Sequence, residues 1–328
     1  MDASAPPKDP RLHAPLAQFG GATPPAPAWF ERAIACAPER STVTVAGAAI
    51  ETMIWGELGR PGLLLLHGNG AHAGWWRMIA PFFAERYRVA ALSWSGMGSS
   101  DWRPTYTLEN FAAEVMAVSE AAGLFTGSRK PVAVGHSFGS FPLAETAARH
   151  GEHFAGIVLV DSPFSSPERR EARRRARGEK PRRPNELRPH NVYPTLEAAL
   201  ARFRLAPSQP CENLYIADMI AREALKRAPR PHGSGEGWTW RFDPFLWRDF
   251  KLPDMTSTLA RAKCVTALMR GGLSELMRPE DAAYTLGLMP AGTAYIEVPE
   301  AYHHVMIDQP LAFIAALRGL LTAWESAS

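Results

Sequence analysis

The chain has 328 residues, of which 46% are hydrophobic and 21% are charged. These ordinary values exclude a disordered, collagen-like or coiled-coil protein, and the length predicts one large domain with an insertion or two modest domains. No apolar stretch approaches the roughly 20 residues that cross a bilayer, so no membrane span is predicted. The N-terminus lacks the apolar core of a secretory signal, and the three cysteines are widely spread. We therefore expect a cytoplasmic protein without a disulfide framework or a cysteine metal site.

The positive charge of the chain is concentrated in one short segment. Lys and Arg number 36 against 33 Asp and Glu, and nine of the basic residues fall between Glu168 and Pro184. A nucleic-acid-binding protein needs a broader basic surface, so no nucleic-acid partner is predicted. The segment is typical of a solvated charged face, with attraction of an anionic substrate as the alternative.

Short apolar runs alternate along the chain with helical patterns. The runs predict strands at residues 50–55, 63–66, 87–93, 131–134, 156–160, 265–269 and 294–298. The helical patterns cover residues 108–122, 138–149, 279–286 and 310–324. This alternation predicts an α/β fold, with a doubly wound and mostly parallel sheet covered on both faces.

The alternation breaks between residues 162 and 254, where an arginine-rich segment, a helical pattern at 212–227 and an aromatic cluster replace it. Strands resume afterwards, so this stretch is predicted to be a helical cap inserted into a core made of residues 41–161 and 255–328. Residues 1–40 are expected to form a lead rich in Pro and Ala. An insertion that follows the carboxyl end of a strand lies over the edge where open α/β sheets bind ligands.

The strongest motif is Gly-His-Ser-Phe-Gly at residues 135–139, between a predicted strand and a predicted helix. A sharp strand-to-helix turn needs glycine on both sides, and it exposes the serine hydroxyl at the start of the helix. Ser137 is therefore a candidate nucleophile. The alternative is a tight strand-to-helix turn in which the serine has no catalytic role.

A serine hydroxyl needs a base to take its proton and a third group to orient that base. Two later strands end in suitable residues. Glu275 follows the strand at 265–269, and His303 and His304 follow the strand at 294–298. The chain order is serine, acid, histidine.

With these residues the chain resembles the α/β-hydrolase superfamily over about residues 41–161 and 255–328. The matching motifs are the His67-Gly68 pair, the Gly-Met-Gly-Ser-Ser loop at 96–100, the elbow at Ser137, and His303 with Asp308-Gln309-Pro310. The resemblance implies the fold and a serine hydrolase, and it does not specify a substrate.

The resemblance also favours His303 over His304, because the catalytic histidine of such proteins usually lies five residues before the acid of Asp-x-Pro. The same proteins usually carry an aspartate where this chain has Ser274 and Glu275. Glutamate can orient an imidazole equally well, so Glu275 is the predicted acid. Asp161, which ends the strand at 156–160, is the alternative, since some members take their acid from that position.

Acyl transfer needs backbone donors for the developing oxyanion. We expect them to be the N–H of Phe138, directly after the nucleophile, and the N–H of Asn69, in the loop after His67-Gly68.

Aromatic residues gather in the segments expected near Ser137, and they favour a small substrate with apolar or ring character. The predicted pocket residues are Trp76, Trp94, Trp238 and Trp240, with packing of the cap onto the core as the alternative for each.

The sequence thus predicts an esterase- or lactonase-type serine hydrolase. A carbon–carbon bond hydrolase using the same serine, and a non-catalytic ligand-binding module of the same fold, remain alternatives. No cofactor or metal is predicted, because no ligand cluster or phosphate-binding glycine loop joined to Lys is visible.

Overall fold

A computed structural model describes residues 9–162, 164–176, 187–231 and 234–327 of the chain. The described residues form two compact units. The larger unit comprises Ala28–Pro189 and Phe242–Ser328, and the smaller one comprises Met1–Pro27 and His190–Arg241.

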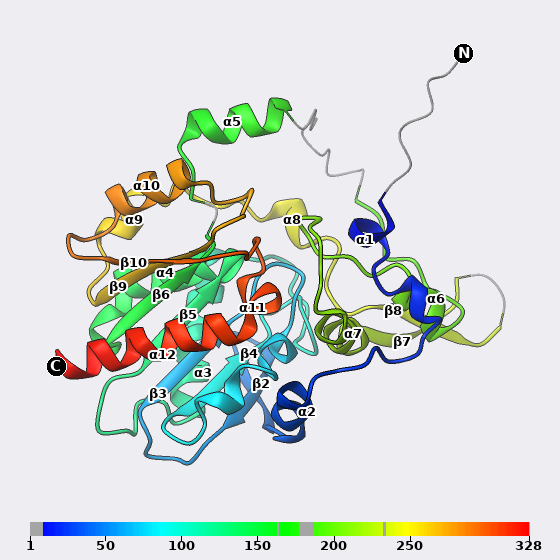
Figure 1. Ribbon diagram of the computed structural model, residues 1–328, viewed down its shortest axis with the longest axis horizontal. Coiled ribbons are helices and arrows are strands. Elements are labelled where there is room, and N and C mark those ends of the chain that lie inside the picture. The colour runs from blue at the N-terminus through cyan, green and yellow to red at the C-terminus, as the bar shows by residue number, and fades with distance from the viewer. Residues whose placement is uncertain (1–8, 163, 177–186, 232–233, 328) are drawn as a thin grey trace. The chain divides into compact units, whose positions relative to one another are not determined.

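The larger unit is built on one eight-stranded sheet with the strand order β1-β2-β4-β3-β5-β6-β9-β10 (Figure 1). Only the β1–β2 and β2–β4 pairs are antiparallel. The sheet is therefore mostly parallel, which confirms the predicted fold class. The strands are β1 (Glu39–Val45), β2 (Ala48–Trp55), β3 (Gly62–Leu66), β4 (Arg88–Leu92), β5 (Val132–His136), β6 (Gly156–Val160), β9 (Val265–Gly271) and β10 (Ala294–Val298).

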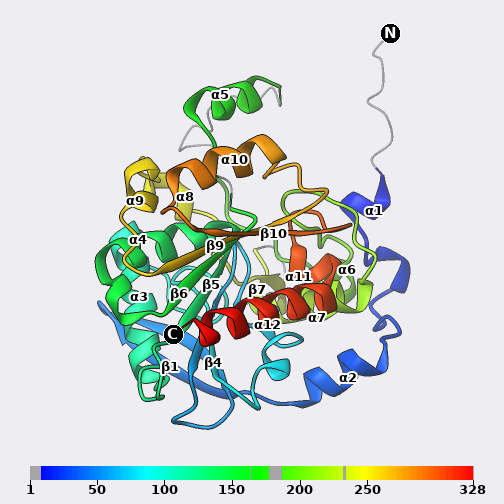
Figure 2. The same cartoon turned by 60° about the vertical axis from the view of Figure 1, so that its left-hand side comes forward.

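Helices cover both faces of this sheet, which explains why its central strands are buried throughout. Every residue of β3, β5 and β6 is buried. Helices α3 (Leu108–Ala121) and α4 (Ser140–His150) lie on one face, and α12 (Pro310–Ser326) lies on the other (Figures 1 and 2). The remaining helices of this unit are α2 (Ala28–Ala35), α5 (Pro167–Ala176), α8 (Leu246–Asp249), α9 (Thr256–Ala260), α10 (Pro279–Leu288) and α11 (Val305–Asp308).

Four adjacent strands, β5, β6, β9 and β10, run parallel and end at the same edge of the sheet. Val134 pairs with Val158 and Val160 pairs with Met269, while Val298 pairs with Gly271. The segments that follow these strands are therefore brought together although they are far apart in the sequence. This edge is where open α/β sheets bind ligands.

The smaller unit contains more than helices. It has α1 (Pro10–His13), α6 (Leu196–Leu200), α7 (Leu214–Glu223) and an antiparallel pair of strands, β7 (Leu225–Pro229) and β8 (Glu236–Trp240). The predicted helix at 212–227 is therefore shorter, because its last residues pair as a strand. Arg222 on α7 donates to the carbonyl of Gly21, which ties the N-terminal segment to this unit. The role of the insertion as a cap stays a prediction.

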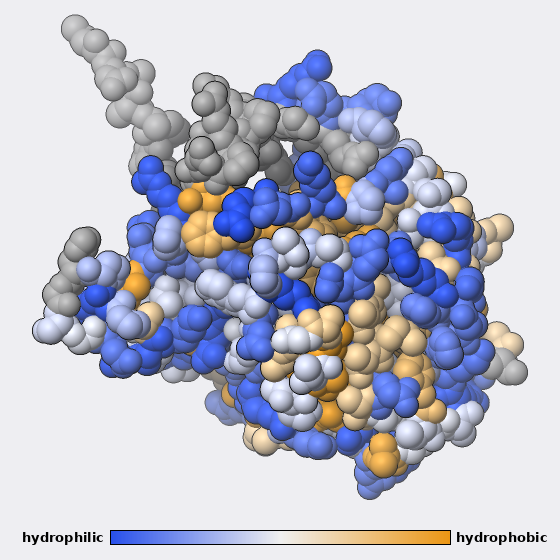
Figure 3. Space-filling model, turned by 180° about the vertical axis from the view of Figure 1, so that it is seen from behind, coloured by the Kyte–Doolittle hydropathy of each residue, from blue (hydrophilic) through white to orange (hydrophobic). Residues whose placement is uncertain are grey.

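Figure 3 shows hydrophilic and hydrophobic residues mixed over one face of the molecule. None of the helices in the described ranges has both the length and the apolar character that crossing a bilayer demands. The arginine-rich segment begins in α5, and its residues from 177 to 184 lie outside the described part of the chain.

A buried ion pair holds β1, β2 and α3 together. Arg103 lies 3.1 Å from Glu114, and their side chains are only 6% and 0% exposed. Arg103 also donates to the carbonyls of Val45 and Ala46 in the β1–β2 turn. Glu114 in turn accepts from the backbone N–H of Ser95. Both charges are thus fully paired, as burial of charged groups requires.

We expect Glu114→Ala to lower the free energy of unfolding by about 3–5 kcal/mol, because it leaves the Arg103 guanidinium buried without its counter-charge. The matched control is Glu57→Ala, which breaks the exposed pair with Arg60 and is expected to cost less than about 1 kcal/mol. Urea denaturation measures both values. Equal, small losses would contradict a structural role for the buried pair.

Candidate active site

Ser137 stands on a strained turn between β5 and α4. Its φ of 52° lies in the left-handed region that L-residues other than glycine rarely adopt. Gly135 and Gly139 permit the turn. A Cβ on Gly135 would lie 2.8 Å from the carbonyl oxygen of Gly139, and a Cβ on Gly139 would lie 2.7 Å from that of His67. The residue Ser137 is half-buried.

His303 reaches Ser137 from the loop that follows β10. Its Nε2 lies 2.9 Å from the Oγ of Ser137, and its side chain is 3% exposed. Asp308 holds this loop, because its carboxylate accepts from the backbone N–H of Tyr302. The predicted contact between Ser137 and His303 is therefore present, and His304 is not the residue that makes it.

Asp161 is the carboxylate that contacts the imidazole. Its Oδ1 lies 2.7 Å from Nδ1 of His303 and accepts from the hydroxyl of Ser274 at 2.6 Å. Its Oδ2 accepts from the backbone N–H of Gly271 at 2.9 Å. The residue is fully buried and, like Ser137, has a positive φ, of 45°. Two neighbouring strands, β5 and β6, are thus each followed by a strained polar residue.

The prediction that Glu275 orients His303 is wrong. Its side chain is 74% exposed and forms an ion pair with Arg278. The residue before it, Ser274, is the one that faces inward and donates to Asp161. The alternative from the sequence, Asp161, holds the position beside the imidazole. One sequence signal favours Asp161. It comes directly after the fully buried strand β6, which pairs with β5, the strand that precedes Ser137.

The loop after β3 lies against the nucleophile. A Cβ on Gly68 would lie 3.1 Å from the Cβ of Ser137, which is tighter than most real Cβ contacts, so glycine favours this close approach. Burial lowers the pKa of His67 to about 3, and the ring is therefore neutral. Its Nδ1–H donates to the carbonyl of Gly68, while its Nε2 accepts from the backbone N–H of Trp94. These bonds fix the loop that carries Asn69, and the N–H groups of Asn69 and Phe138 remain the predicted oxyanion donors.

Two of the predicted pocket residues are core residues instead. Trp76 is 1% exposed, and its ring centroid lies 6.1 Å from that of Phe313 on α12. Trp94 is fully buried and packs edge-on against Phe138, with its Nε1 donating to the carbonyl of His67. Trp94 therefore packs inside the core against the loop after β3 and the turn at Ser137. The prediction that Trp76 and Trp94 line a substrate pocket is wrong, because both side chains are buried in the core.

The other two predicted pocket residues belong to the smaller unit. Trp238 and Trp240 lie on β8, where the guanidinium of Arg227 lies 5.0 Å from the Trp238 ring. Their role in substrate binding stays a prediction.

Trp247, which is not among the predicted pocket residues, contacts both residues that are expected to supply the oxyanion donors. Trp247 on α8 donates from its Nε1 to the side-chain oxygen of Asn69 at 3.0 Å. Its ring packs edge-on against Phe138 at 5.7 Å and against Phe250 at 5.3 Å. Because Trp247 is 43% exposed, it offers an apolar surface beside the nucleophile.

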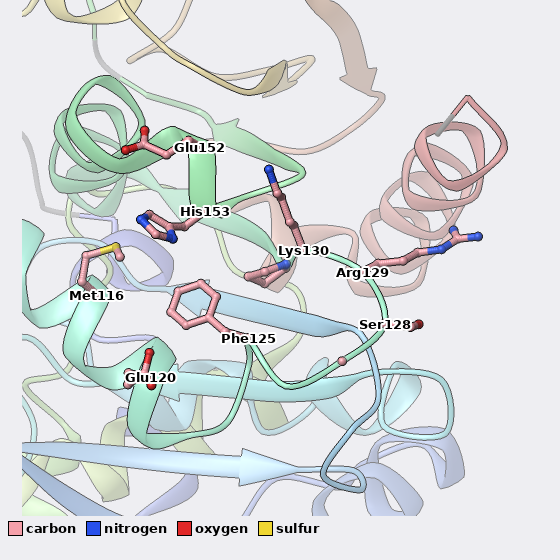
Figure 4. Close-up of a pocket in the computed structure, with 10 residues that line it drawn as sticks. Met116, Glu120, Phe125, Ser128, Arg129, Lys130, Glu152 and His153 are labelled. Atoms are coloured by element: carbon pink, nitrogen blue, oxygen red, sulfur yellow. The ribbon is translucent and has the colours of Figure 1, made fainter.

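A separate pocket of about 410 Å³ lies near the amino end of β5, away from Ser137 (Figure 4). Phe125, Lys130, Glu152 and His153 contribute to its lining, so charges of both signs face it. None of the three residues of the hydrogen-bonded line Ser137–His303–Asp161 lines this pocket.

Comparisons with known proteins give a matching family model and several relatives. The model of the family described as "Alpha/beta hydrolase family" matches residues 63–317. The chain is 26% identical over 310 residues to a serine hydrolase-like protein of Danio rerio, which covers 86% of this chain and 91% of that protein. It is also 26% identical over 287 residues to esterase Rv0045c of Mycobacterium tuberculosis, covering 84% and 88% of the two chains.

A further match is shorter. The chain is 32% identical over 120 residues to a 1-acylglycerol-3-phosphate O-acyltransferase of Arabidopsis thaliana, covering 34% of this chain and 27% of that protein. It thus spans about a quarter of the length of that relative. Among solved structures, E-2-(acetamidomethylene)succinate hydrolase superposes with a TM-score of 0.69 at 18% identity, over 87% of this chain and 99% of that one. This likeness concerns the fold.

The backbone strain at Ser137 leads to a stability prediction. We expect Ser137→Gly to be more stable than Ser137→Ala by about 1 kcal/mol, because glycine adopts a positive φ without a Cβ penalty. Both variants lose the hydroxyl, so the comparison isolates the backbone. The control is Ser140, whose φ is −71°. There glycine should be less stable than alanine, and the same sign at both positions in urea denaturation would rule out strain at Ser137.

Proposed function

We propose that this chain, which belongs to the alpha/beta hydrolase family, is a serine hydrolase that cleaves carboxylic esters or related acyl bonds. The observation that carries the proposal is the continuous hydrogen-bonded line from Ser137 through His303 to Asp161, with distances of 2.9 and 2.7 Å. Nucleophile, base and orienting acid in this order are what activation of a hydroxyl requires.

In the first half of the reaction, the Oγ of Ser137 attacks the carbonyl carbon while its proton passes to Nε2 of His303. Asp161 accepts the Nδ1–H and stabilises the imidazolium that forms. The negative charge on the former carbonyl oxygen is held by the N–H groups of Phe138 and Asn69, each worth about 3–4 kcal/mol. The imidazolium then protonates the leaving alcohol, and the acyl group stays on Ser137.

In the second half, a water molecule gives its proton to Nε2 of His303 and attacks the acyl carbon. Collapse of this intermediate returns the proton to Oγ of Ser137 and releases the acid. Asp161 keeps the same role in both halves. Since its two oxygens accept three hydrogen bonds, from His303, Ser274 and Gly271, it is held as an acceptor throughout.

A small substrate with an apolar or ring-bearing group fits the surroundings of Ser137, because Trp247, Phe138 and Phe250 form an aromatic cluster there. Residues 162–254 stay the proposed cap insertion, with Trp238 and Trp240 on β8 as further candidates for contact with substrate. The names of a serine hydrolase-like relative and an esterase relative support the acyl reaction. A lactone, or a carbon–carbon bond beside a carbonyl, would use the same three residues, and a non-catalytic ligand-binding role is the alternative from another class.

We expect a fluorophosphonate probe to label the wild-type chain and to leave Ser137→Ala unlabelled, because the probe reacts with an activated serine. With p-nitrophenyl esters, Asp161→Asn should lower kcat by about 10⁴-fold, since the amide cannot hold the correct imidazole tautomer. Labelling and kcat are read on the same preparations.

The matched control is Glu275→Gln, which changes an exposed carboxylate that is paired with Arg278. It should keep near wild-type turnover. A loss in Glu275→Gln with activity retained in Asp161→Asn would contradict the assignment of the acid. Absence of labelling in the wild-type chain would favour the ligand-binding role.

The contact between Trp247 and Asn69 leads to a specificity prediction. We expect Trp247→Ala to lower kcat/KM for aryl esters by about tenfold, the effect of losing roughly 1.4 kcal/mol of aromatic contact. Acetate esters of short alcohols should lose less, and Trp247→Phe should retain most of the aryl preference. The control is Tyr295→Ala, since Tyr295 is also 43% exposed but lies on β10. An equal loss for aryl and short-chain esters would show that Trp247 acts on the loop rather than on the substrate.

A further inference from the structure

Three buried histidines lie together beside the nucleophile. His136, His303 and His304 are 1%, 2% and 3% exposed, and one ring nitrogen from each lies within 4.8 Å of those of the other two. The ring centroids of His303 lie 4.8 Å from those of both neighbours, and those of His136 and His304 are 5.4 Å apart. Among the residues that the structure describes, this is the one cluster of three metal-ligating side chains found.

The cluster arises from the parallel sheet. His136 is the last residue of β5, and the two other histidines follow β10. Because 166 residues separate His136 from the nearest of them in the sequence, ligand spacing along the chain does not reveal the site. All three belong to the larger unit.

His136 has a ring nitrogen, Nδ1, whose lone pair could bind a metal ion. Its Nε2–H donates to the backbone carbonyl of His303 at 2.9 Å, which leaves the lone pair on Nδ1. No hydrogen-bond partner for that buried nitrogen exists in the described part of the chain. Burial, followed by the proximity of His303, holds the pKa of His136 well below its ordinary value.

Neutral imidazole nitrogens select borderline transition metals over Mg²⁺ and Ca²⁺, which prefer oxygen ligands. In a tetrahedral zinc site with bonds of about 2.0–2.1 Å, ligand nitrogens lie about 3.4 Å apart. The three histidines would therefore have to approach one another by about 1.4 Å or less to share one ion. Rotation of the side chains His303 and His304, which stand on a loop, can supply part of this change.

We propose that His136, His303 and His304 bind a single Zn²⁺, Ni²⁺ or Cu²⁺ ion, and that the bound ion reversibly inhibits the chain. A metal ion on His303 occupies the lone pair that takes the proton of Ser137, or displaces the hydrogen bond to Asp161. In either case the base is lost. The binding itself does not depend on the proposed function, whereas the inhibition rests on it.

The first experiment measures binding without any need for activity. Co²⁺ is added to Ser137→Ala, and its visible absorption bands report nitrogen ligation, while calorimetry with Zn²⁺ gives the stoichiometry. We expect one ion per chain. His304→Gln should weaken binding by about tenfold or more. The matched control His153→Gln, at an exposed histidine of the separate pocket, should leave it unchanged.

The second experiment measures inhibition of ester hydrolysis and of fluorophosphonate labelling by Zn²⁺, with Mg²⁺ as the control ion. Zn²⁺ should inhibit the wild-type chain and EDTA should restore its activity. The concentration for half-inhibition, relative to each variant's own metal-free rate, should rise about tenfold or more in His304→Gln. It should stay the same in His153→Gln.

The outcomes separate the two proposals. If Zn²⁺ and Co²⁺ neither bind Ser137→Ala nor slow the wild-type chain, the metal site is excluded, although labelling would still support the hydrolase. If the ions bind as tightly to His304→Gln as to the parent, the site lies elsewhere and the proposal fails. If the wild-type chain shows no labelling without metal, the hydrolase proposal fails, and the Co²⁺ spectrum still decides on the histidine cluster.

Discussion

The parallel hydrogen bonding of β5, β6, β9 and β10 determines where the residues of the proposed active site lie. Each of these strands contributes one participant at its carboxyl end, namely Ser137, Asp161, Ser274 and His303. In each of the three parallel pairings the two strands are hydrogen-bonded up to their carboxyl ends, so these ends lie side by side. The pairings thereby bring together the groups that lie 2.9 and 2.7 Å apart along the line of hydrogen bonds.

This arrangement requires backbone conformations that the isolated residues disfavour. Ser137 and Asp161 both adopt a positive φ, which costs on the order of 1–3 kcal/mol at each position. Close packing compensates for that cost. Gly68 and Gly139 let the loop after β3 approach the elbow, and the end of β9 binds Asp161 through the N–H of Gly271. Strain that is concentrated where the reactive groups emerge is typical of functional sites.

The sequence predicts the part of the fold that depends on burial. The predicted strands at 156–160 and 294–298 have the bounds of β6 and β10, because each is a short run between clear turn signals. Strand β1 escaped prediction because most of its residues are exposed and give no apolar run. Strands β7 and β8 were not predicted either, because each has only five residues and these alternate in burial, which gives no apolar run.

Within the site, the sequence identifies residue types at strand ends but not the direction of their side chains. It therefore finds Ser137 and His303, and it cannot tell whether Glu275 or Asp161 faces the imidazole. The choice among tryptophans fails for a related reason. The hydrophobicity of tryptophan does not indicate whether a given ring is buried in the core, as Trp94 is, or is partly exposed beside Asn69, as Trp247 is. The proximity of His136 to the two late histidines depends on strand order, which no local pattern contains.

The contact between Ser274 and Asp161 bears on how such a site can change during evolution. Asp161, after β6, contacts His303 through Oδ1, and Ser274, after β9, donates its hydroxyl to the same oxygen. Residue 274 therefore lies beside the position that the carboxylate occupies. Under the proposed function, a lineage could acquire a second carboxylate at residue 274 while Asp161 still orients His303. It could later lose Asp161 without passing through an inactive ancestor. The location of the acid is therefore a poor marker of descent, whereas the location of the serine, confined to a single glycine-flanked elbow, is a good one.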